Sequence, residues 1–307
     1  MNARGLTVLV TVLLVVAVVL AILLLAQPST PAASPGPSPS LAPNPTAGLN
    51  EALLEIRLTV LVIGLDTSET RRERGEGANS DTIILASVSA DQSEVTLISL
   101  PRDTVDIPMP DGTTWSSKVN AIYDQLGVDA LVVSAETLFA VPIDGYAEID
   151  MDDLVDLVEA VDGVEVNPPD PLDDPIVDLH LEPGRQTLDG PTALAYVRTR
   201  VDTDYGRAAR QQEVLLDLVA RLVSPETDVD VAVLLDGLNS FETDLPLEDL
   251  PTLLEIARLS QSATVTRQVL QPTEFITFEG DAGDGRGYIL VPDVEAIRDL
   301  AARTIGD

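Results

Sequence analysis

Four arginines crowd into thirteen residues of the segment YVRTRVDTDYGRAARQQ, namely Arg198, Arg200, Arg207 and Arg210. Like charges repel, so such a cluster is costly unless an anion or nearby carboxylates neutralise it. The guanidinium fork matches phosphate oxygens bidentately, and the cluster therefore favours a phosphate or diphosphate ligand. A salt-bridge network of Arg198 and Arg200 with Asp202 and Asp204 explains the same spacing without any ligand.

The spacing of these residues also predicts how they are presented. Arg198 and Arg200 are two residues apart and share one face if the chain is extended there. Arg207 and Gln211 are four apart and share one face of a helix, for which Asp204 is the expected N-cap. Guanidinium groups and a helix N-terminus are thus expected to converge at one place.

A pair of acids forms the second candidate site. Asp66 closes the apolar run LTVLVIGLD, and Asp81 opens the next run, DTIILASVSA. If the two runs are neighbouring antiparallel strands, both carboxylates lie at one edge of the sheet. That arrangement suits Mg²⁺, which takes one or two carboxylates and leaves its other positions to water and phosphate. Alternatively, each acid simply caps a turn.

The stretch SLPRDT supplies a further arginine. Arg102 follows an apolar strand pattern, and Asp103 beside it can pair with an arginine and orient it. An ordinary surface ion pair is the alternative.

The elements that must position these groups alternate between strand and helix patterns. Strands are expected at 58–66, 81–90, 94–102, 146–150 and 163–167, with a hairpin turn at 91–93. The first is a near-continuous apolar run, as expected of a strand buried on both faces. Helices are expected at 117–127, 128–140, 151–161 and 207–223, and after 223 two or three more with a strand at GYILV. The fold class is α/β (α+β), with a central mixed, largely antiparallel sheet flanked by helices.

The N-terminal segment indicates a membrane anchor. Residues 6–26 carry no charge, and as a helix they span roughly 30 Å, the thickness of the bilayer hydrocarbon. A cleaved signal peptide has a shorter apolar core, so an uncleaved transmembrane helix is favoured over it. Arg4 in the short tail 1–5 places that tail in the cytoplasm and the rest outside. A Pro/Ser/Ala-rich spacer (27–50), a catalytic domain (58–223) and a C-terminal extension (224–307) are expected to follow.

Composition narrows the choice of function. The chain has 307 residues, a net charge of −33 and no cysteine, which rules out disulfides and thiolate chemistry. The acidic field repels phosphate backbones, so nucleic acid is not an expected partner.

The ordered motifs VLVIGLD, NSDTIILASV, VTLISLPRDT, KVNAIYDQLG and DYGRAARQQEVL resemble the LytR-CpsA-Psr (LCP) family of bacterial cell-envelope enzymes. The resemblance covers nearly all of 58–223 and weakens after it. It implies a phosphotransferase, anchored in the cytoplasmic membrane, that moves a glycopolymer from a polyprenyl pyrophosphate or phosphate carrier to a peptidoglycan hydroxyl, forming a phosphodiester.

The resemblance also implies roles for individual residues. It makes Asp66 and Asp81 the acids associated with Mg²⁺, or with Mn²⁺ in its place. The pyrophosphate contacts, which with Asp103 form the expected catalytic set, are Arg102, Arg198, Arg200 and Arg207. Gln211 adds a polar contact, Asp103 and Asp204 support the arginines, and Lys118, the only lysine, is placed near the site.

Several points remain open from the sequence alone. Either Asp103 or Asp81 is a candidate to deprotonate the acceptor, whereas His180 is expected to be structural or superficial. Helices at 119–139, 151–161 and 207–223 are candidates to line a cleft for the lipid. A non-catalytic capture or regulatory protein, a polyprenyl pyrophosphatase and a DNA-binding regulator are the rival functions.

Overall fold

The computed structural model describes residues 49–75, 77–227, 229, 242–245 and 249–306. The predicted tail, anchor and nearly all of the spacer lie outside these residues. Within the described part of the chain, no helix is both long and apolar enough to cross a membrane.

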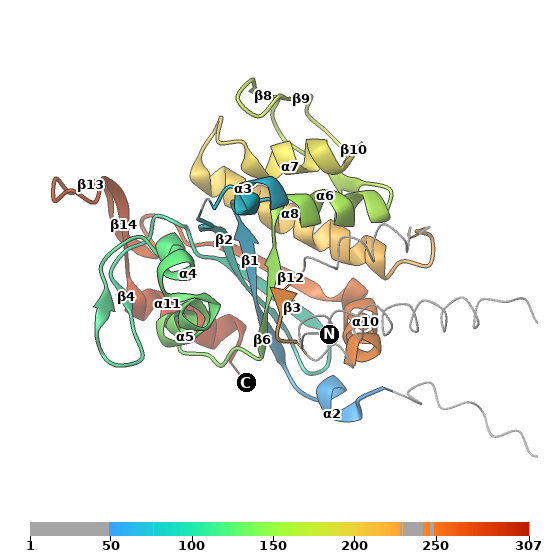
Figure 1. Cartoon of the computed structure of the whole chain (residues 1–307). Helices are drawn as coiled ribbons and strands as arrows, with labels where there is room; N and C mark the ends of the chain where they lie inside the picture. Colours follow the sequence, from blue (N-terminus) through green and yellow to red (C-terminus); the bar gives the residue numbers. More distant parts are fainter. Residues whose placement is uncertain (1–48, 76, 228, 230–241, 246–248, 307) are drawn as a thin grey trace, which may run out of the picture.

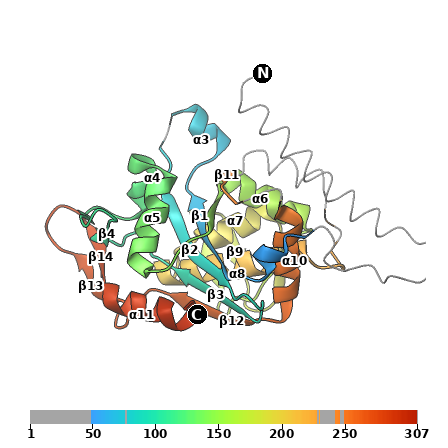
Figure 2. The same cartoon turned by 90° about the horizontal axis from the view of Figure 1, so that it is seen from below.

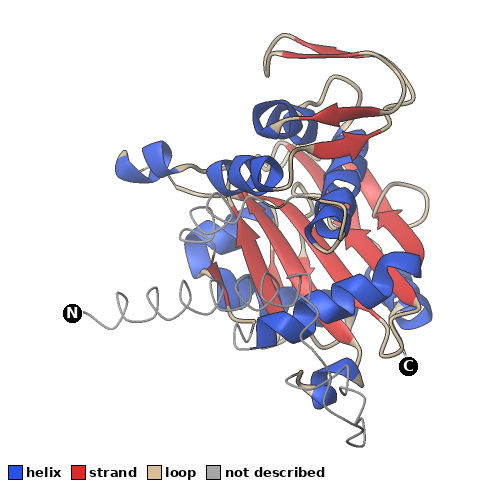
Figure 3. Cartoon of the chain, turned by 90° about the vertical axis from the view of Figure 1, so that its right-hand side faces the viewer, coloured by secondary structure: helices blue, strands red, loops and turns tan. Residues whose placement is uncertain are grey.

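A mixed sheet runs through the centre of the molecule (Figures 1 and 3). Among the described residues its strand order is β11-β6-β1-β2-β3-β12. The inner strands β1, β2 and β3 form an antiparallel meander, whereas β6 pairs with β1, and β12 with β3, in parallel. The strands are β1 (Leu58–Leu65), β2 (Ser80–Val88), β3 (Glu94–Ser99), β6 (Gly145–Ile149), β11 (Glu242–Thr243) and β12 (Thr264–Val269).

The predicted strands and the hairpin between β2 and β3 are confirmed, and so is the mixed α/β class. The segment after residue 223 supplies both edge strands, since β11 pairs with β6 and β12 pairs with β3. This segment therefore completes the central sheet.

Helices cover both faces of the sheet (Figure 3). One face packs against α4 (Asn120–Leu126), α5 (Val128–Phe139) and α11 (Val294–Thr304), which share a continuous apolar core with β1, β2 and β3. A second apolar cluster joins α6 (Met151–Ala160), α7 (Gly190–Arg198) and α8 (Asp204–Leu222) on the opposite side (Figure 2). Two short antiparallel strand pairs complete this second layer. They are β7 (Val164–Val166) with β10 (Gln186–Leu188), and β8 (Leu172–Asp174) with β9 (Leu179–Leu181).

Strand β1 differs in one respect from the sequence prediction. Its burial alternates strictly: Leu61 and Ile63 are fully buried in the first core, but the intervening residues are only half-buried. Val62 and Gly64 on that second face line a cavity beneath the helices. The run is apolar throughout because its second face borders an apolar cavity.

Gln212 fixes helix α8 to the sheet one turn after Arg207. Its amide is almost fully buried and donates to Ser99 Oγ at 2.8 Å and to the carbonyl of Gln268 at 2.9 Å. The amide therefore joins α8 to β3 and to β12, and it sets the height of α8 over the sheet.

We expect Gln212→Ala to lower the free energy of unfolding by about 2 kcal/mol, because it leaves buried acceptors without a donor. Guanidinium denaturation followed by circular dichroism measures this. Gln261→Ala is the matched control and should change the value by less than about 0.5 kcal/mol, since Gln261 is exposed. An equal effect of the two changes would contradict the role given to Gln212.

Candidate active site

The two acids meet at one edge of the sheet, as the antiparallel pairing of β1 and β2 requires. Leu65 pairs with Ser80, and the amide of Asp66 donates to the carbonyl of Asn79 at 3.0 Å. Asp66 and Asp81 line the same cavity. The sequence prediction for their placement is confirmed.

Asp81 is the centre of the charged cluster. Its carboxylate pairs directly with Arg102, lies 3.5 Å from Arg200 and 3.9 Å from Arg207, and accepts a hydrogen bond from Asn120 at 3.2 Å. Asp81 thus faces three guanidinium groups, and Asp103 and Asp204 supply the further carboxylates that pair with them.

Arg102 and Asp103 lie in the loop directly after β3. Asp103 Oδ2 lies 3.6 Å from Arg102 Nε, and the other oxygen of Asp103 accepts a hydrogen bond from Lys118 Nζ. The structure therefore places the only lysine of the chain beside the arginine loop. Asp103 holds Arg102 on one side and Lys118 on the other.

Arg198 and Arg200 are presented differently from the extended arrangement that their spacing suggests. Arg198 is the last residue of α7, and the chain becomes extended only at Thr199. Arg198 reaches Asp66 at 3.8 Å and Arg200 reaches Asp81. Both side chains are about half exposed, at 47% and 44%, and are therefore open to a ligand.

Arg207 is the buried member of the cluster, with only 6% of its side chain exposed. Burial, together with the nearby Arg102 and Arg200, lowers the pKa of Arg207 to about 10, so the guanidinium is still charged at neutral pH. The predicted N-cap of its helix is wrong by one residue. Thr203 is the cap and accepts a hydrogen bond from the amide of Gly206, whereas Asp204 is the first helical residue and lies 3.4 Å from Arg207.

Arg210 is the structural member of the opening cluster. Its guanidinium is buried and donates to the carbonyls of Tyr196 and Thr199 and to both oxygens of Asp202. It braces the turn that carries Arg200. The alternative of a salt-bridge network is thus correct in part: Asp204 pairs with Arg200, but Asp202 pairs with Arg210 and Arg198 with Asp66.

An apolar cavity of about 430 Å³ opens from this cluster and runs between the sheet and the helix layer. Its charged end carries Asp66, Asp81, Arg102, Arg198, Arg200 and Arg207. Its walls come from β1, β2, the end of β6 and helices α6, α7 and α8, and include Val62, Ile84, Leu154, Leu194, Val214, Leu215 and Leu218. The cavity can therefore bind a ligand with an anionic head and a long apolar tail.

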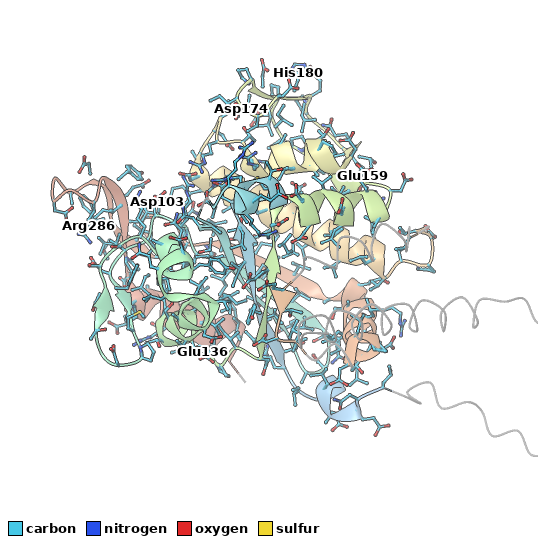
Figure 4. The ribbon with its side chains drawn as sticks, viewed as in Figure 1. Asp103, Glu136, Glu159, Asp174, His180 and Arg286 are labelled. Carbon is cyan, nitrogen blue, oxygen red and sulfur yellow. The ribbon has the colours of Figure 1, made fainter. Side chains whose placement is uncertain are left out.

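The prediction of the lining helices is correct for α6 and α8 and wrong for the 119–139 segment. Helices α4 and α5 pack into the core on the other face of the sheet. Helix α7 lines the cavity instead. His180 lies on the outer β8–β9 hairpin, 73% exposed and far from the cluster (Figure 4).

A second cavity, of about 230 Å³, adjoins the first and shares Asp81, Arg102, Arg207 and Gln211 with it. The remaining wall includes Tyr205, Glu279, Tyr288 and Leu290. The last three belong to the hairpin of β13 (Ile276–Asp281) and β14 (Tyr288–Pro292), in a region where sequence motifs assigned no site residue. The sequence signals for it were the strand predicted at GYILV and the stretch GDAGDGRG before it, for which a loop and a binding segment were both open.

The acidic residues of the site are compatible with a divalent cation that takes its remaining ligands from a substrate. Asp66 and Asp81 are the acids at the charged end, and the described residues contain no group of three or more His, Cys, Asp or Glu placed to hold a metal. Mg²⁺ fits such a site because it keeps several waters and phosphate oxygens as ligands.

Comparison with known proteins decides the family. The sequence profile of the LytR_cpsA_psr family matches residues 43–297. This chain belongs to the LytR-CpsA-Psr family. The LytR-CpsA-Psr profile extends well past residue 223 and includes β12 and the β13–β14 hairpin.

Two members of the LytR-CpsA-Psr family illustrate the similarity in sequence. The polyisoprenyl-teichoic acid–peptidoglycan teichoic acid transferase TagU of Enterococcus faecalis is 33% identical over 245 residues, which are 78% of this chain and 76% of TagU. TagV of Bacillus subtilis, named as the same kind of transferase, is 30% identical over 174 residues, or 54% of this chain and 44% of TagV.

Solved structures of other proteins show the same fold. The crystal structure of B. subtilis TagV superposes with a TM-score of 0.65 at 24% identity and covers 82% of this chain and 98% of that chain. TagT bound to LIIa-WTA superposes with a TM-score of 0.64 at 22% identity and covers 82% and 90%.

Proposed function

We propose that this protein is an LCP-type phosphotransferase that moves a glycopolymer from a polyprenyl diphosphate or monophosphate carrier to peptidoglycan. One observation carries the proposal: the arginine cluster stands at the mouth of an apolar cavity, so an anionic head and an isoprenoid tail are accommodated together. The family membership and the names of TagU and TagV support the same class of reaction.

The proposed chemistry is a displacement at phosphorus that needs no covalent enzyme intermediate. The acceptor hydroxyl oxygen forms a new bond to the phosphorus that carries the polymer. The bond from that phosphorus to the carrier phosphate breaks, and the carrier monophosphate leaves with the electron pair. The hydroxyl proton passes to Asp81 or Asp103. Arg102, Arg200 and Arg207 surround Asp81 and hold the diphosphate oxygens while charge shifts onto the leaving phosphate.

Mg²⁺, or Mn²⁺ in its place, is the proposed cofactor, held by Asp66 and Asp81 together with substrate oxygens. When bound, it neutralises part of the diphosphate charge. The arginines still bind and orient the head group, and Asp103 still keeps Arg102 in place.

The proposed location follows from the apolar N-terminal segment. Residues 6–26 anchor the chain in the cytoplasmic membrane, with the N-terminus inside and the catalytic domain outside, where carrier and peptidoglycan both occur. The net charge of −33 supports a role without nucleic acid.

Two other functions fit the same cavity. A capture protein would bind the lipid-linked polymer without turnover, and a pyrophosphatase would use water as acceptor. Both share the site with the transferase and differ only in the fate of the bound diphosphate.

We expect the affinity of the full-length protein in detergent for polyprenyl diphosphates to rise with the number of isoprene units until the apolar cavity is filled. Each buried CH₂ contributes about 0.8 kcal/mol. Leu215→Trp, which fills part of the cavity, should weaken binding of the longest chain about tenfold but leave inorganic pyrophosphate binding unchanged. Val219→Trp on the exposed side of the same helix is the control.

The same preparation decides the function when it is incubated with Mg²⁺, a polyprenyl diphosphate carrying one N-acetylhexosamine, and uncross-linked peptidoglycan chains. Sugar phosphate attached to the glycan supports transfer. Release of sugar phosphate into water alone supports the pyrophosphatase. Tight binding without either product supports capture.

A further inference from the structure

The two cavities lie on opposite sides of the charged residues that they share. The apolar cavity is bounded by α6, α7 and α8, whereas the smaller one is closed by the arginine loop and the β13–β14 hairpin. Figure 1 shows this hairpin on the far side of the sheet end from α6 and α7. Figure 4 places Asp103 of the smaller cavity at the left of the view and Asp174 of the apolar cavity near its top.

The smaller cavity is lined by polar groups of several kinds. Asp204 Oδ1 lies 3.3 Å from Arg200 Nε, and Asp103 Oδ2 lies 3.6 Å from Arg102 Nε. Arg207 Nε makes no hydrogen bond within the described residues. The walls thus present guanidinium donors, carboxylate acceptors and tyrosine hydroxyls together, a mixture that suits a neutral ligand rich in hydroxyl groups.

The outer rim of the cavity has the form of a carbohydrate contact. Tyr288 is half exposed, and its hydroxyl donates to Glu279 across the hairpin. Burial, the hydrogen bond to Glu279 and its charge raise the pKa of Tyr288 to about 12, so the phenol keeps its proton at neutral pH. A tyrosine offers a flat apolar face and a polar edge together.

The hairpin is held rigidly against the arginine loop. The amide of Leu290 donates to the carbonyl of Asp103 at 3.0 Å, and the amide of Val105 donates back to Leu290 at 2.9 Å. Arg286 at the hairpin turn pairs with Asp106 at 3.0 Å. Tyr288 and Glu279 are therefore fixed relative to Arg102.

We propose that this cavity is the acceptor subsite: it binds a sugar of the glycan that receives the polymer, with Tyr205, Glu279 and Tyr288 as its contacts. This inference rests on the proposed transfer reaction. In a displacement at phosphorus, the incoming oxygen approaches opposite to the leaving oxygen. The carrier phosphate leaves on the side of the apolar cavity, and the hydroxyl must then arrive from the hairpin side.

The test uses the full-length protein in detergent with Glu279→Gln, Tyr288→Phe and their double variant. The matched control is Phe278→Leu, since Phe278 is exposed on the opposite face of β13 and outside both cavities. We expect each single change to raise the KM for uncross-linked peptidoglycan chains about fivefold, and the double change about 25-fold. The Kd for polyprenyl diphosphate–N-acetylhexosamine should stay within about twofold.

An unchanged acceptor KM in the double variant overturns the proposal. A higher Kd for the donor with an unchanged KM for the acceptor also overturns the proposal, and assigns the cavity to the first sugar of the donor. If the wild-type protein transfers nothing, the proposed reaction fails, and binding of muramidase-released glycan fragments by calorimetry decides the subsite separately. Binding that is lost in the double variant retains it, and binding that is equal in both proteins, or absent from both, rejects it.

Discussion

Replacing Arg207 with methionine should lower kcat/KM about 10²- to 10³-fold without destabilising the ligand-free protein. The fold-change is that expected for loss of one preorganised group that stabilises charge in the transition state. Burial, and after it the nearby Arg102 and Arg200, lower the pKa of Arg207 to about 10 and so disfavour its charge. Its removal relieves this repulsion, and the melting temperature should stay equal or rise.

Thermal unfolding with and without inorganic pyrophosphate measures both parts of this prediction. The wild-type protein should melt higher with pyrophosphate, and the Arg207→Met protein should not respond. Arg221→Met is the matched control, because Arg221 lies on the same helix, pairs with Asp217 and borders neither cavity. A large fall in the melting temperature of Arg207→Met alone would instead make Arg207 a structural residue.

Asp81→Asn should strengthen the binding of pyrophosphate but slow the transfer reaction. Asp81 is the counter-charge of three arginines, so its neutralisation should strengthen binding of metal-free pyrophosphate about tenfold. Transfer in the presence of Mg²⁺ should nevertheless fall about 10²-fold or more, since the arginines lose their anchor and the cation loses a ligand.

Calorimetry in the presence of a chelator gives the first quantity, and the glycan transfer assay gives the second. Asp173→Asn removes the same charge at a position that is 78% exposed and outside both cavities, so it should change neither. If Asp81→Asn weakens binding of metal-free pyrophosphate, Asp81 acts by holding the arginines in their binding geometry more than by neutralising them.

The sequence was sufficient for features determined by local pattern. The two consecutive apolar runs at 58–66 and 81–90 were enough to predict an antiparallel pair that brings Asp66 near Asp81. The sequence alone could not show whether Thr203 or Asp204 caps α8, because both residue types are favoured at N-caps and the two residues are adjacent.

Features that depend on topology were not readable from the chain. Helices α5 and α8 both carry apolar stripes, and only the crossovers decide that α5 fills a core while α8 lines a cavity. Glu279 and Tyr288 lie far along the chain from Arg102, and no local pattern indicates that they share a wall with it.

The hydrogen bond between Gln212 and β12 has a consequence for the order in which the chain folds during synthesis. Ribosomes deliver β1 to β3 and α8 early, but β12, whose carbonyl at Gln268 receives the Gln212 amide, comes much later. Until that edge strand docks, the Gln212 amide lacks its acceptor on β12 and joins α8 only to β3. We therefore expect a chain that ends before β12 to contain the whole arginine motif yet to hold α8 less firmly over the sheet.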